Sequence, residues 1–160
     1  MNAMRLIEAN RRALALCEDP AEVVAEVWQS QALAQAIGSR LAVAGPPELR
    51  GEALGLSEVG GRACTVLDAP RLGTEDIRAA RLSETGDAQE VLVALDGLFG
   101  EVGIALVGVA MGAAEEGVYW QCMEAIDAAD ESRDRVLEML RRLAMREQRL
   151  PEADSAAGPS

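Results

Sequence analysis

The segment that most constrains the fold is GLFGEVGIALVGVAMGAAEEG, residues 97–117, which is almost wholly apolar and dotted with glycine. Its longest run without a charge, residues 102–114, is shorter than the ~20 apolar residues that span a bilayer. Extending the run back to Val91 takes in Asp96 and Glu101, and a charge in the middle of a membrane helix costs roughly 2.5–3.5 kcal/mol. We therefore expect no membrane span and predict a buried helix inside a folded domain.

Helical periodicity puts apolar side chains on most sides of this helix, which is typical of a central helix. One broad face consists of Val91, Leu92, Leu95, Leu98, Phe99, Val102, Leu106 and Val109. A second apolar patch consists of Val93, Ile104, Val107 and Met111. The remaining narrow stripe holds small residues and one acid, namely Ala94, Gly97, Glu101, Ala105, Gly108 and Gly112.

The small residues of this stripe predict an interface. Glycine inside a helix costs roughly 0.5–1 kcal/mol relative to alanine, so several on one line indicate that another backbone packs closely there. Glu101 in the middle of the stripe is expected either to face solvent or to pair with Arg40 or Arg62 of a neighbouring helix or subunit. The predicted interface residues are Gly97, Glu101, Ala105, Gly108 and Gly112.

The rest of the chain reads as helices separated by local stop signals. Residues 4–17 are amphipathic, and Asp19-Pro20-x-Glu22 supplies a cap for a second helix that ends near Ala44. A third helix is expected over residues 47–66. The next segment, 67–86, reads as a connector holding one short helix capped by Thr74, and the central helix is capped by Asp87 with Glu90.

A last helix starts near Glu115 and is either continuous or broken near Asp130. These elements predict an all-α fold, a compact bundle of five to six helices around the central apolar, glycine-rich helix. The 160 residues fit one domain, which we place at residues 1–150, followed by a disordered tail at 151–160.

Composition excludes several classes of function. The chain has no histidine and no lysine, so it cannot build a Ser-His-Asp unit, an imidazole metal ligand, a P-loop lysine or a Schiff base. Its formal charge of -12 repels phosphate, so we expect no nucleic-acid partner. The three cysteines are far apart and the first residues carry charges where a signal peptide is apolar, which predicts a bacterial cytoplasmic protein with reduced thiols.

One acidic feature suggests an alternative with chemistry. Glu124, Asp127 and Asp130 are spaced by three residues, which places three carboxylates along one flank of a helix. Such a row can bind Mg²⁺ or Mn²⁺, because these ions prefer oxygen ligands. All-α nucleotide pyrophosphohydrolases use an acidic bundle of this type, and Glu124-x-x-Asp127 resembles half of their signature. The other half is weak, since Glu115 and Glu116 lie on the same helix, too close in sequence, and no lysine completes a phosphate site. The plain interpretation is a solvated acidic face without a metal.

Three stretches carry a resemblance to a known family: WQSQALAQAIGSRLAVAGPPELRGEALGLSEVGGRAC, GEVGIALVGVA and YWQCMEAIDAADESRDRVLEMLRRLA. Together they resemble a small actinobacterial family of helical proteins, a domain of unknown function. The resemblance covers most of residues 4–146, agrees with a cytosolic location and implies no activity.

The sequence thus predicts a protein that is not an enzyme. We expect a helical interaction or scaffold protein, a homodimer or a subunit of a complex, because the chain has a surplus of apolar residues and the small-residue stripe. This interpretation assigns no catalytic residue and no cofactor. The alternative is the Mg²⁺- or Mn²⁺-dependent hydrolase described above, and a third is a pocket for an apolar ligand beside the glycines.

Overall fold

The computed structural model describes residues 1–67 and 74–156, with side chains for 1–67 and 75–149. It contains the α-helices α1 (Ala3–Ala15), α2 (Pro20–Ala44), α3 (Arg50–Val66), α4 (Ala88–Met111) and α5 (Glu116–Ala156). Short 3₁₀ turns lie at η1 (Pro47–Leu49), η2 (Thr74–Asp76) and η3 (Arg78–Arg81). Apart from one isolated bridge between Asn2 and Glu84, the described residues form no β-structure. The all-α prediction is confirmed.

Side-chain caps fix where three of the helices begin. The Asp19 side chain accepts from the backbone N–H of Glu22 at 2.9 Å, and Asp87 accepts from that of Glu90 at 3.0 Å, both as the sequence predicts. Asn2 caps α1 in the same way. These caps satisfy N–H groups that have no partner within the first turn, so the helix starts are encoded locally.

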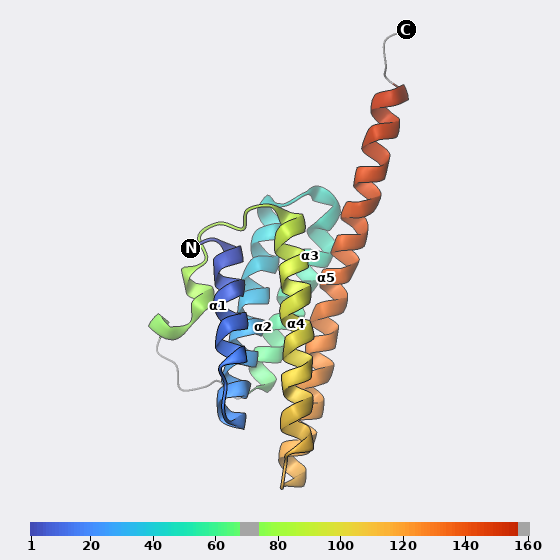
Figure 1. Ribbon diagram of the computed structural model, residues 1–160. Helices are drawn as coiled ribbons and strands as arrows, with labels where there is room; N and C mark the ends of the chain where they lie inside the picture. The colour runs from blue at the N-terminus through green and yellow to red at the C-terminus, as the bar shows by residue number, and fades with distance from the viewer. Residues whose placement is uncertain (68–73, 157–160) are drawn as a thin grey trace.

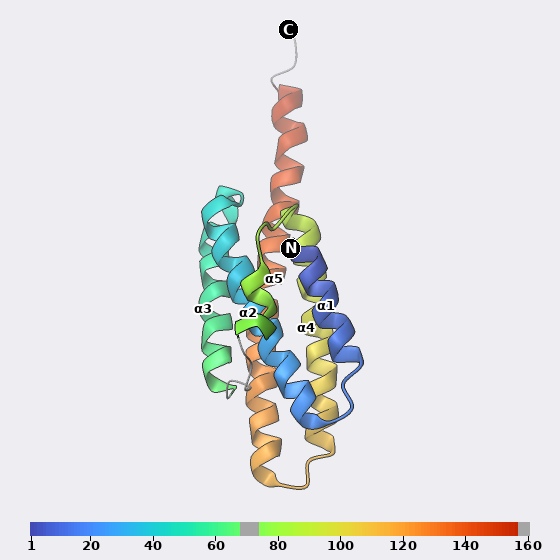
Figure 2. The same cartoon turned by 90° about the vertical axis from the view of Figure 1, so that its left-hand side faces the viewer.

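The helices form an elongated bundle with α2 in its middle, flanked by α1 and α4 on one side and by α3 on the other (Figures 1 and 2). α4 and α5 form a long antiparallel hairpin, and α5 then continues alone beyond the other helices. The largest fully buried side chains are aliphatic apart from Phe99 and come from all five helices and η1. They are Leu6, Ile7, Leu33, Ile37, Leu49, Leu56, Leu92, Leu95, Leu98, Phe99, Leu106 and Met139.

The backbones of α2 and α3 approach each other closely at Gly38 and Gly60. A Cβ placed at Gly38 would lie 2.7 Å from the carbonyl oxygen of Ala53, and one at Gly60 would lie 2.9 Å from that of Gln31. Side chains do not fit at such distances, so these glycines allow the two helices to touch through their backbones. Within the described chain a close backbone contact thus occurs at these two glycines, whereas in the stripe of α4 Gly97 meets an arginine side chain and Gly108 meets open space.

α4 is buried along its broad face but not along its second apolar patch. Val91, Leu92, Leu95, Leu98, Phe99, Val102 and Leu106 belong to the core, whereas Val93, Ile104, Val107 and Met111 are exposed. Among the described helices, α4 alone is long and apolar enough to cross a membrane, judged by length and composition only. Here its broad face packs against α1, α2 and α5, as the core helix of a bundle does.

The end of the chain and the connector differ from expectation in detail. α5 is continuous through Asp130, which settles that alternative, and it runs to Ala156, past the boundary predicted at 150. In place of one short helix, the connector holds the turns η2 and η3. Its residues 68–73, the Thr74 cap and the last four residues of the expected tail lie outside what the structure describes.

Candidate functional site

Glu101 is paired, but its partner is Arg11 of α1. The Arg11 Nη2–Glu101 Oε1 distance is 2.7 Å and the Nε–Oε2 distance is 3.0 Å, so the guanidinium donates two parallel hydrogen bonds. The bond to Glu101 is the largest cause of a raised pKa for Arg11. The two arginines predicted as partners are engaged elsewhere: Arg40 donates to the carbonyls of Leu82 and Ser83, and Arg62 pairs with Glu131.

A second arginine reaches α4 from the opposite side. Arg133 of α5 donates to Asp96 through Nε at 2.6 Å, and this bond is the main cause of its raised pKa. Glycines lie beneath both guanidinium groups. A Cβ at Gly97 would lie 3.3 Å from Arg11 Nη1, and one at Gly100 would lie 3.7 Å from Arg133 Nη2. Gly97 therefore makes room for an arginine, not for another backbone.

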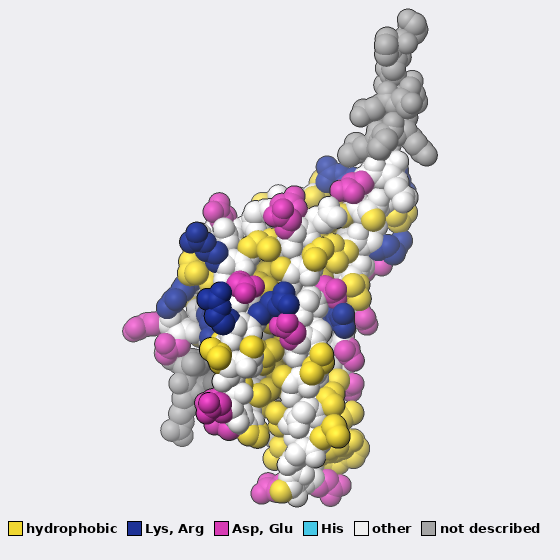
Figure 3. Space-filling view, in the orientation of Figure 1, with side chains coloured by type: hydrophobic (Ala, Val, Ile, Leu, Met, Phe, Trp, Pro, Cys, Tyr) yellow, Lys and Arg dark blue, Asp and Glu magenta, His cyan; other side chains and the backbone are white. Residues whose placement is uncertain are grey.

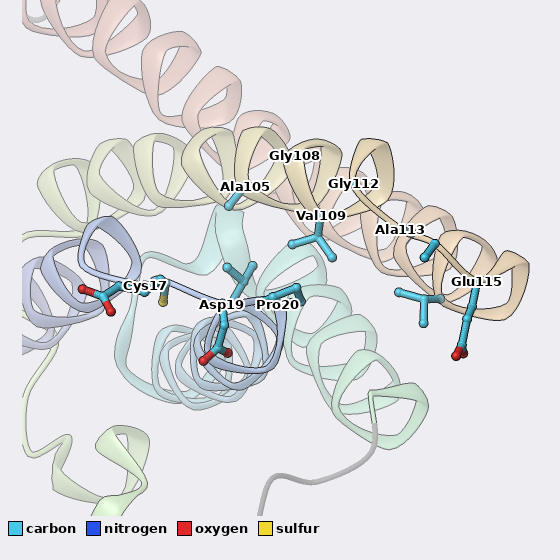
Figure 4. Close-up of a pocket in the computed structure, with 13 residues that line it drawn as sticks. Cys17, Asp19, Pro20, Ala105, Gly108, Val109, Gly112, Ala113 and Glu115 are labelled. Carbon is cyan, nitrogen blue, oxygen red and sulfur yellow. The ribbon is translucent and has the colours of Figure 1, made fainter.

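A shallow groove follows α4 on the side of α1, and we call it the α4 groove. Its upper part, of about 600 Å³, is lined by Arg11, Arg12, Glu101 and Ala105, among others. Its lower part, of about 580 Å³, also begins at Ala105 and ends at acids. Figure 4 shows this lower part between the end of α4 and the turn from α1 to α2, with Cys17, Asp19, Pro20 and Glu115 among the residues around it.

All five predicted interface residues lie along this edge of α4. Glu101 and Ala105 line the upper part of the groove, Ala105, Gly108 and Gly112 line the lower part, and Gly97 lies under Arg11. No atom from elsewhere in the described chain lies within 4 Å of a Cβ placed at Gly108. Gly108 and Gly112 are therefore exposed in the single chain, with space above Gly108 for a side chain from outside, whereas Gly97, Glu101 and Ala105 are partly buried.

Large apolar side chains stand out from the same helix. Ile104 is 75% exposed and Met111 is 83% exposed, and Val93 and Val107 are exposed as well. Helical spacing aligns these four with Gly108 on one side of α4, and we call the set Val93, Ile104, Val107, Gly108 and Met111 the α4 face. Beyond the turn, α5 adds exposed Tyr119 and Trp120, whose rings meet edge to face. In Figure 3 the lower half of the hairpin shows mainly hydrophobic and uncharged atoms, below a band of charges.

The acidic row predicted for metal does not form a metal site in the described residues. Glu124, Asp127 and Asp130 are all exposed along α5. Within residues 1–67 and 75–149, no group of three or more acidic or thiol side chains is arranged to hold a metal ion. The negative charge of Asp130 instead helps to raise the pKa of Arg133.

The cysteines are free thiols in apolar surroundings. Burial raises the pKa of Cys17 and Cys122, and it raises that of Cys64 to about 11. A reactive cysteine needs the opposite shift, since the thiolate is the nucleophile. The three residues thus have the character of small hydrophobic side chains.

A further cavity of about 440 Å³ lies between the start of α2, the end of α3, α4 and α5. Its lining is mostly aliphatic, and Gln121 and Glu124 supply its polar groups. Leu106 and Val109 are the residues of α4 that line it, and none of the glycines of α4 does. It therefore differs from the pocket beside the glycines that the sequence suggests.

Sequence reasoning missed the arginines and the exposed patch. Asp96 and Glu101 are the only acids between Val91 and Ala114, which is a signal that both need partners. The spacing of Ile104, Val107 and Met111 was visible as well, but a helical wheel does not say how many neighbours a helix has.

The fold and this site define a class of protein, an all-helical bundle with an apolar helix face exposed beside a groove. The chain belongs to a family of unknown function, DUF6099, whose family model matches residues 1–142. The expected membership in a domain of unknown function is confirmed. No curated protein and no solved structure matches the chain.

Proposed function

We propose that the protein is a non-enzymatic interaction protein that buries the α4 face and the start of α5 against another polypeptide. The observation that carries this proposal is the concentration of exposed apolar side chains there: Ile104, Val107 and Met111 on α4, with Tyr119 and Trp120 across the turn. A contiguous exposed apolar patch costs solubility, and such patches mark interaction surfaces. Aromatic residues and methionine are also enriched in interfaces.

The surroundings of this patch support binding over catalysis. The chain lacks histidine and lysine, so it has no imidazole base and no side-chain amine nucleophile. Its thiols have raised pKa values, which disfavours the reactive thiolate form. The Mg²⁺- or Mn²⁺-dependent hydrolase stays a prediction without geometric support from the described carboxylates. We place the interaction in the cytoplasm, where free thiols such as these persist.

Cysteine labelling inside cells tests whether any polypeptide covers the α4 face. The experiment uses Ile104→Cys and Val43→Cys, both in a background with Cys17→Ala and Cys64→Ala, expressed from the gene's own chromosomal position. Val43 is 84% exposed on α2, outside the α4 face, and so serves as a matched free site. A membrane-permeant maleimide is added and the labelled fraction is read by mass spectrometry.

We expect position 104 to label at least tenfold more slowly than position 43 in cells, and both to label equally fast in urea. Equal rates in intact cells would mean that the α4 face is bare, and the proposed function would be wrong.

A further inference from the structure

We propose that the cavity between α2, α3, α4 and α5 binds a small amphiphilic cation, a molecule with one ammonium group on an aliphatic chain. The inference goes beyond the proposed function, because this cavity is separate from the α4 face. It is also not the metal site that the acidic row suggests, since Asp127 and Asp130 do not line the cavity. Two features carry the inference: an aliphatic floor and one carboxylate at the mouth.

The floor of the cavity consists of buried side chains. Leu106 of α4 is fully buried, and Cys122 and Ala125 of α5 are each 3% exposed. The volume of about 440 Å³ lies within the range of ligand pockets and far above ordinary packing voids. Water against such a floor finds few polar partners, so an aliphatic chain that displaces it lowers the free energy.

The mouth of the cavity is formed by the exposed members of the lining, which come from the start of α2, the end of α3 and α5. They are Pro20, Ala21, Val66, Gln121 and Glu124. Among all the lining residues, Glu124 alone carries a charge. Gln121 lies one helical turn before Glu124 on the same side of α5, so both can contact one polar group at the mouth.

The carboxylate of Glu124 selects the charge of the occupant. Glu124 makes no ion pair within the part of the chain that the structure describes. The formal charge of -12 adds to its attraction for a cation and to its repulsion of an anion. An ammonium group at Glu124 and Gln121, with its chain over Leu106 and Cys122, satisfies both parts of the site. A fatty acid matches the floor equally well but brings its carboxylate against that of Glu124.

The volume of the cavity limits the size of the occupant. At the ~30 Å³ that one water molecule takes up in the liquid, 440 Å³ corresponds to about 15 heavy atoms. Decylammonium, with its ten carbons and one nitrogen, stays within this limit and serves as the probe. Decanoate has a chain of the same length and the opposite charge, and it serves as the matched control ligand.

The first test is isothermal titration calorimetry of the full chain with each probe, below the concentration at which the probe forms micelles. We expect decylammonium to bind at one site per chain, at least tenfold more tightly than decanoate. Glu124→Gln should reduce this preference at least fivefold, because it removes the charge from the lining. Asp127→Asn removes an exposed charge from the same helix outside the cavity and should keep the preference.

The second test is the position of the bound probe, read from the methyl NMR signals of the wild-type chain. We expect decylammonium to shift the signals of Val24, Val66 and Leu106, which line the cavity. The signals of Val23 in the lower α4 groove and of Ile104 on the α4 face should shift much less. This test needs no substitution, so it does not depend on a variant that folds.

Each contrary outcome overturns a defined part of the inference. No binding of decylammonium at millimolar concentration overturns the site. Equal affinity for the two probes, or a Glu124→Gln variant with the wild-type preference, overturns the cationic class of ligand. Shifts confined to Val23 and Ile104 overturn the cavity as the place of binding. The proposed function is decided separately, by the labelling of Ile104→Cys in cells.

Discussion

Arg11 of α1 and Glu101 of α4 are joined by two hydrogen bonds, of 2.7 and 3.0 Å, although 90 residues separate them in the chain. Their side chains are 37% and 42% exposed, so solvent screens the pair. We expect Arg11→Ala to lower the free energy of unfolding by about 0.5–1 kcal/mol. Urea unfolding of Arg11→Ala, Glu101→Gln and the double variant measures the coupling.

Two control variants accompany this double-mutant cycle. Arg11→Lys should recover little of the loss, because an ammonium group cannot donate two parallel bonds to a carboxylate. Arg12→Ala should change stability less, since Arg12 and Glu8 are more exposed and lie 3.8 Å apart. Independent effects of Arg11→Ala and Glu101→Gln would contradict the pairing.

The crossing of α2 and α3 depends on Gly38. In Gly38→Ala the new methyl group would lie 2.7 Å from the carbonyl oxygen of Ala53 and 2.8 Å from the backbone nitrogen of Ser57, so the helices must separate. We expect a loss of about 2–3 kcal/mol in unfolding free energy, measured by thermal or urea unfolding.

Gly103 provides the matched control for Gly38. It also lies inside a helix, but nothing lies within 4 Å of its Cβ position. Gly103→Ala should therefore stabilise the protein by about 0.5–1 kcal/mol, from helix propensity alone. Equal effects at the two glycines would show that the α2–α3 contact is looser than described.

Stability should decline at alkaline pH because of Cys64. Its thiol has an ordinary pKa of 9.0 and a folded pKa of about 11, caused by burial. Above pH 9 the unfolded chain gives up this proton while the folded chain keeps it, so stability is lost as the pH rises through 11. Applied in full, this difference in pKa corresponds to about 2.3 kcal/mol at pH 11, and because the thiol is only partly buried we expect a loss of about 1–2 kcal/mol.

The measurement is the unfolding free energy from urea titrations at intervals between pH 8 and about 11. Cys64→Ala should show a shallower decline than the wild type, whatever its stability at neutral pH. Parallel curves would mean that Cys64 ionises equally in both states.

The buried contact between Gln31 of α2 and Ser132 of α5 should contribute no net stability. The Ser132 hydroxyl donates to Gln31 Oε1 at 2.7 Å, but Gln31 Nε2 is buried without a partner among the described groups. Ser132→Ala leaves the whole amide without a bond, and we expect a loss of about 1–3 kcal/mol.

Replacing both partners should reverse that loss. The double variant Gln31→Leu, Ser132→Ala removes every buried polar atom of the contact and should be as stable as the wild type or more so, by urea unfolding. A double variant weaker than Ser132→Ala alone would show that the amide has a partner not seen here.

Local signals made most of the fold predictable from the sequence. Asp19 followed by Pro20, and Asp87 followed by Glu90, cap their helices through atoms within one turn. Such contacts depend on a few neighbouring residues, so a linear reading finds them. The end of α5 was harder to predict, because its later turns extend beyond the other helices and no local stop signal in the sequence marks where they end.

Contacts between distant segments were not predictable in the same way. Glu101 needed a cation, but the choice among Arg11, Arg40 and Arg62 depends on which helix lies beside α4. Similarly, the patch of Ile104, Val107 and Met111 has the same periodicity whether a neighbour covers it or not. The interface residues of the stripe could be named, but the space above Gly108 is a property of the packed chain.

The N-terminal segment has a consequence for the order of events during synthesis. Ala3 donates its backbone N–H to the carbonyl of Glu84 at 3.0 Å, and Ser83 donates to that of Met1 at 3.0 Å. The first helix is held in addition by α4, which begins at Ala88. At ~5–20 residues added per second, about 4–16 s pass before these partners exist. α2 and α3 adjoin in sequence, so their hairpin can form on the ribosome. α1 can pack against α2 early as well, but it gains its contacts with residues 83–84 and with α4 only after these have been made.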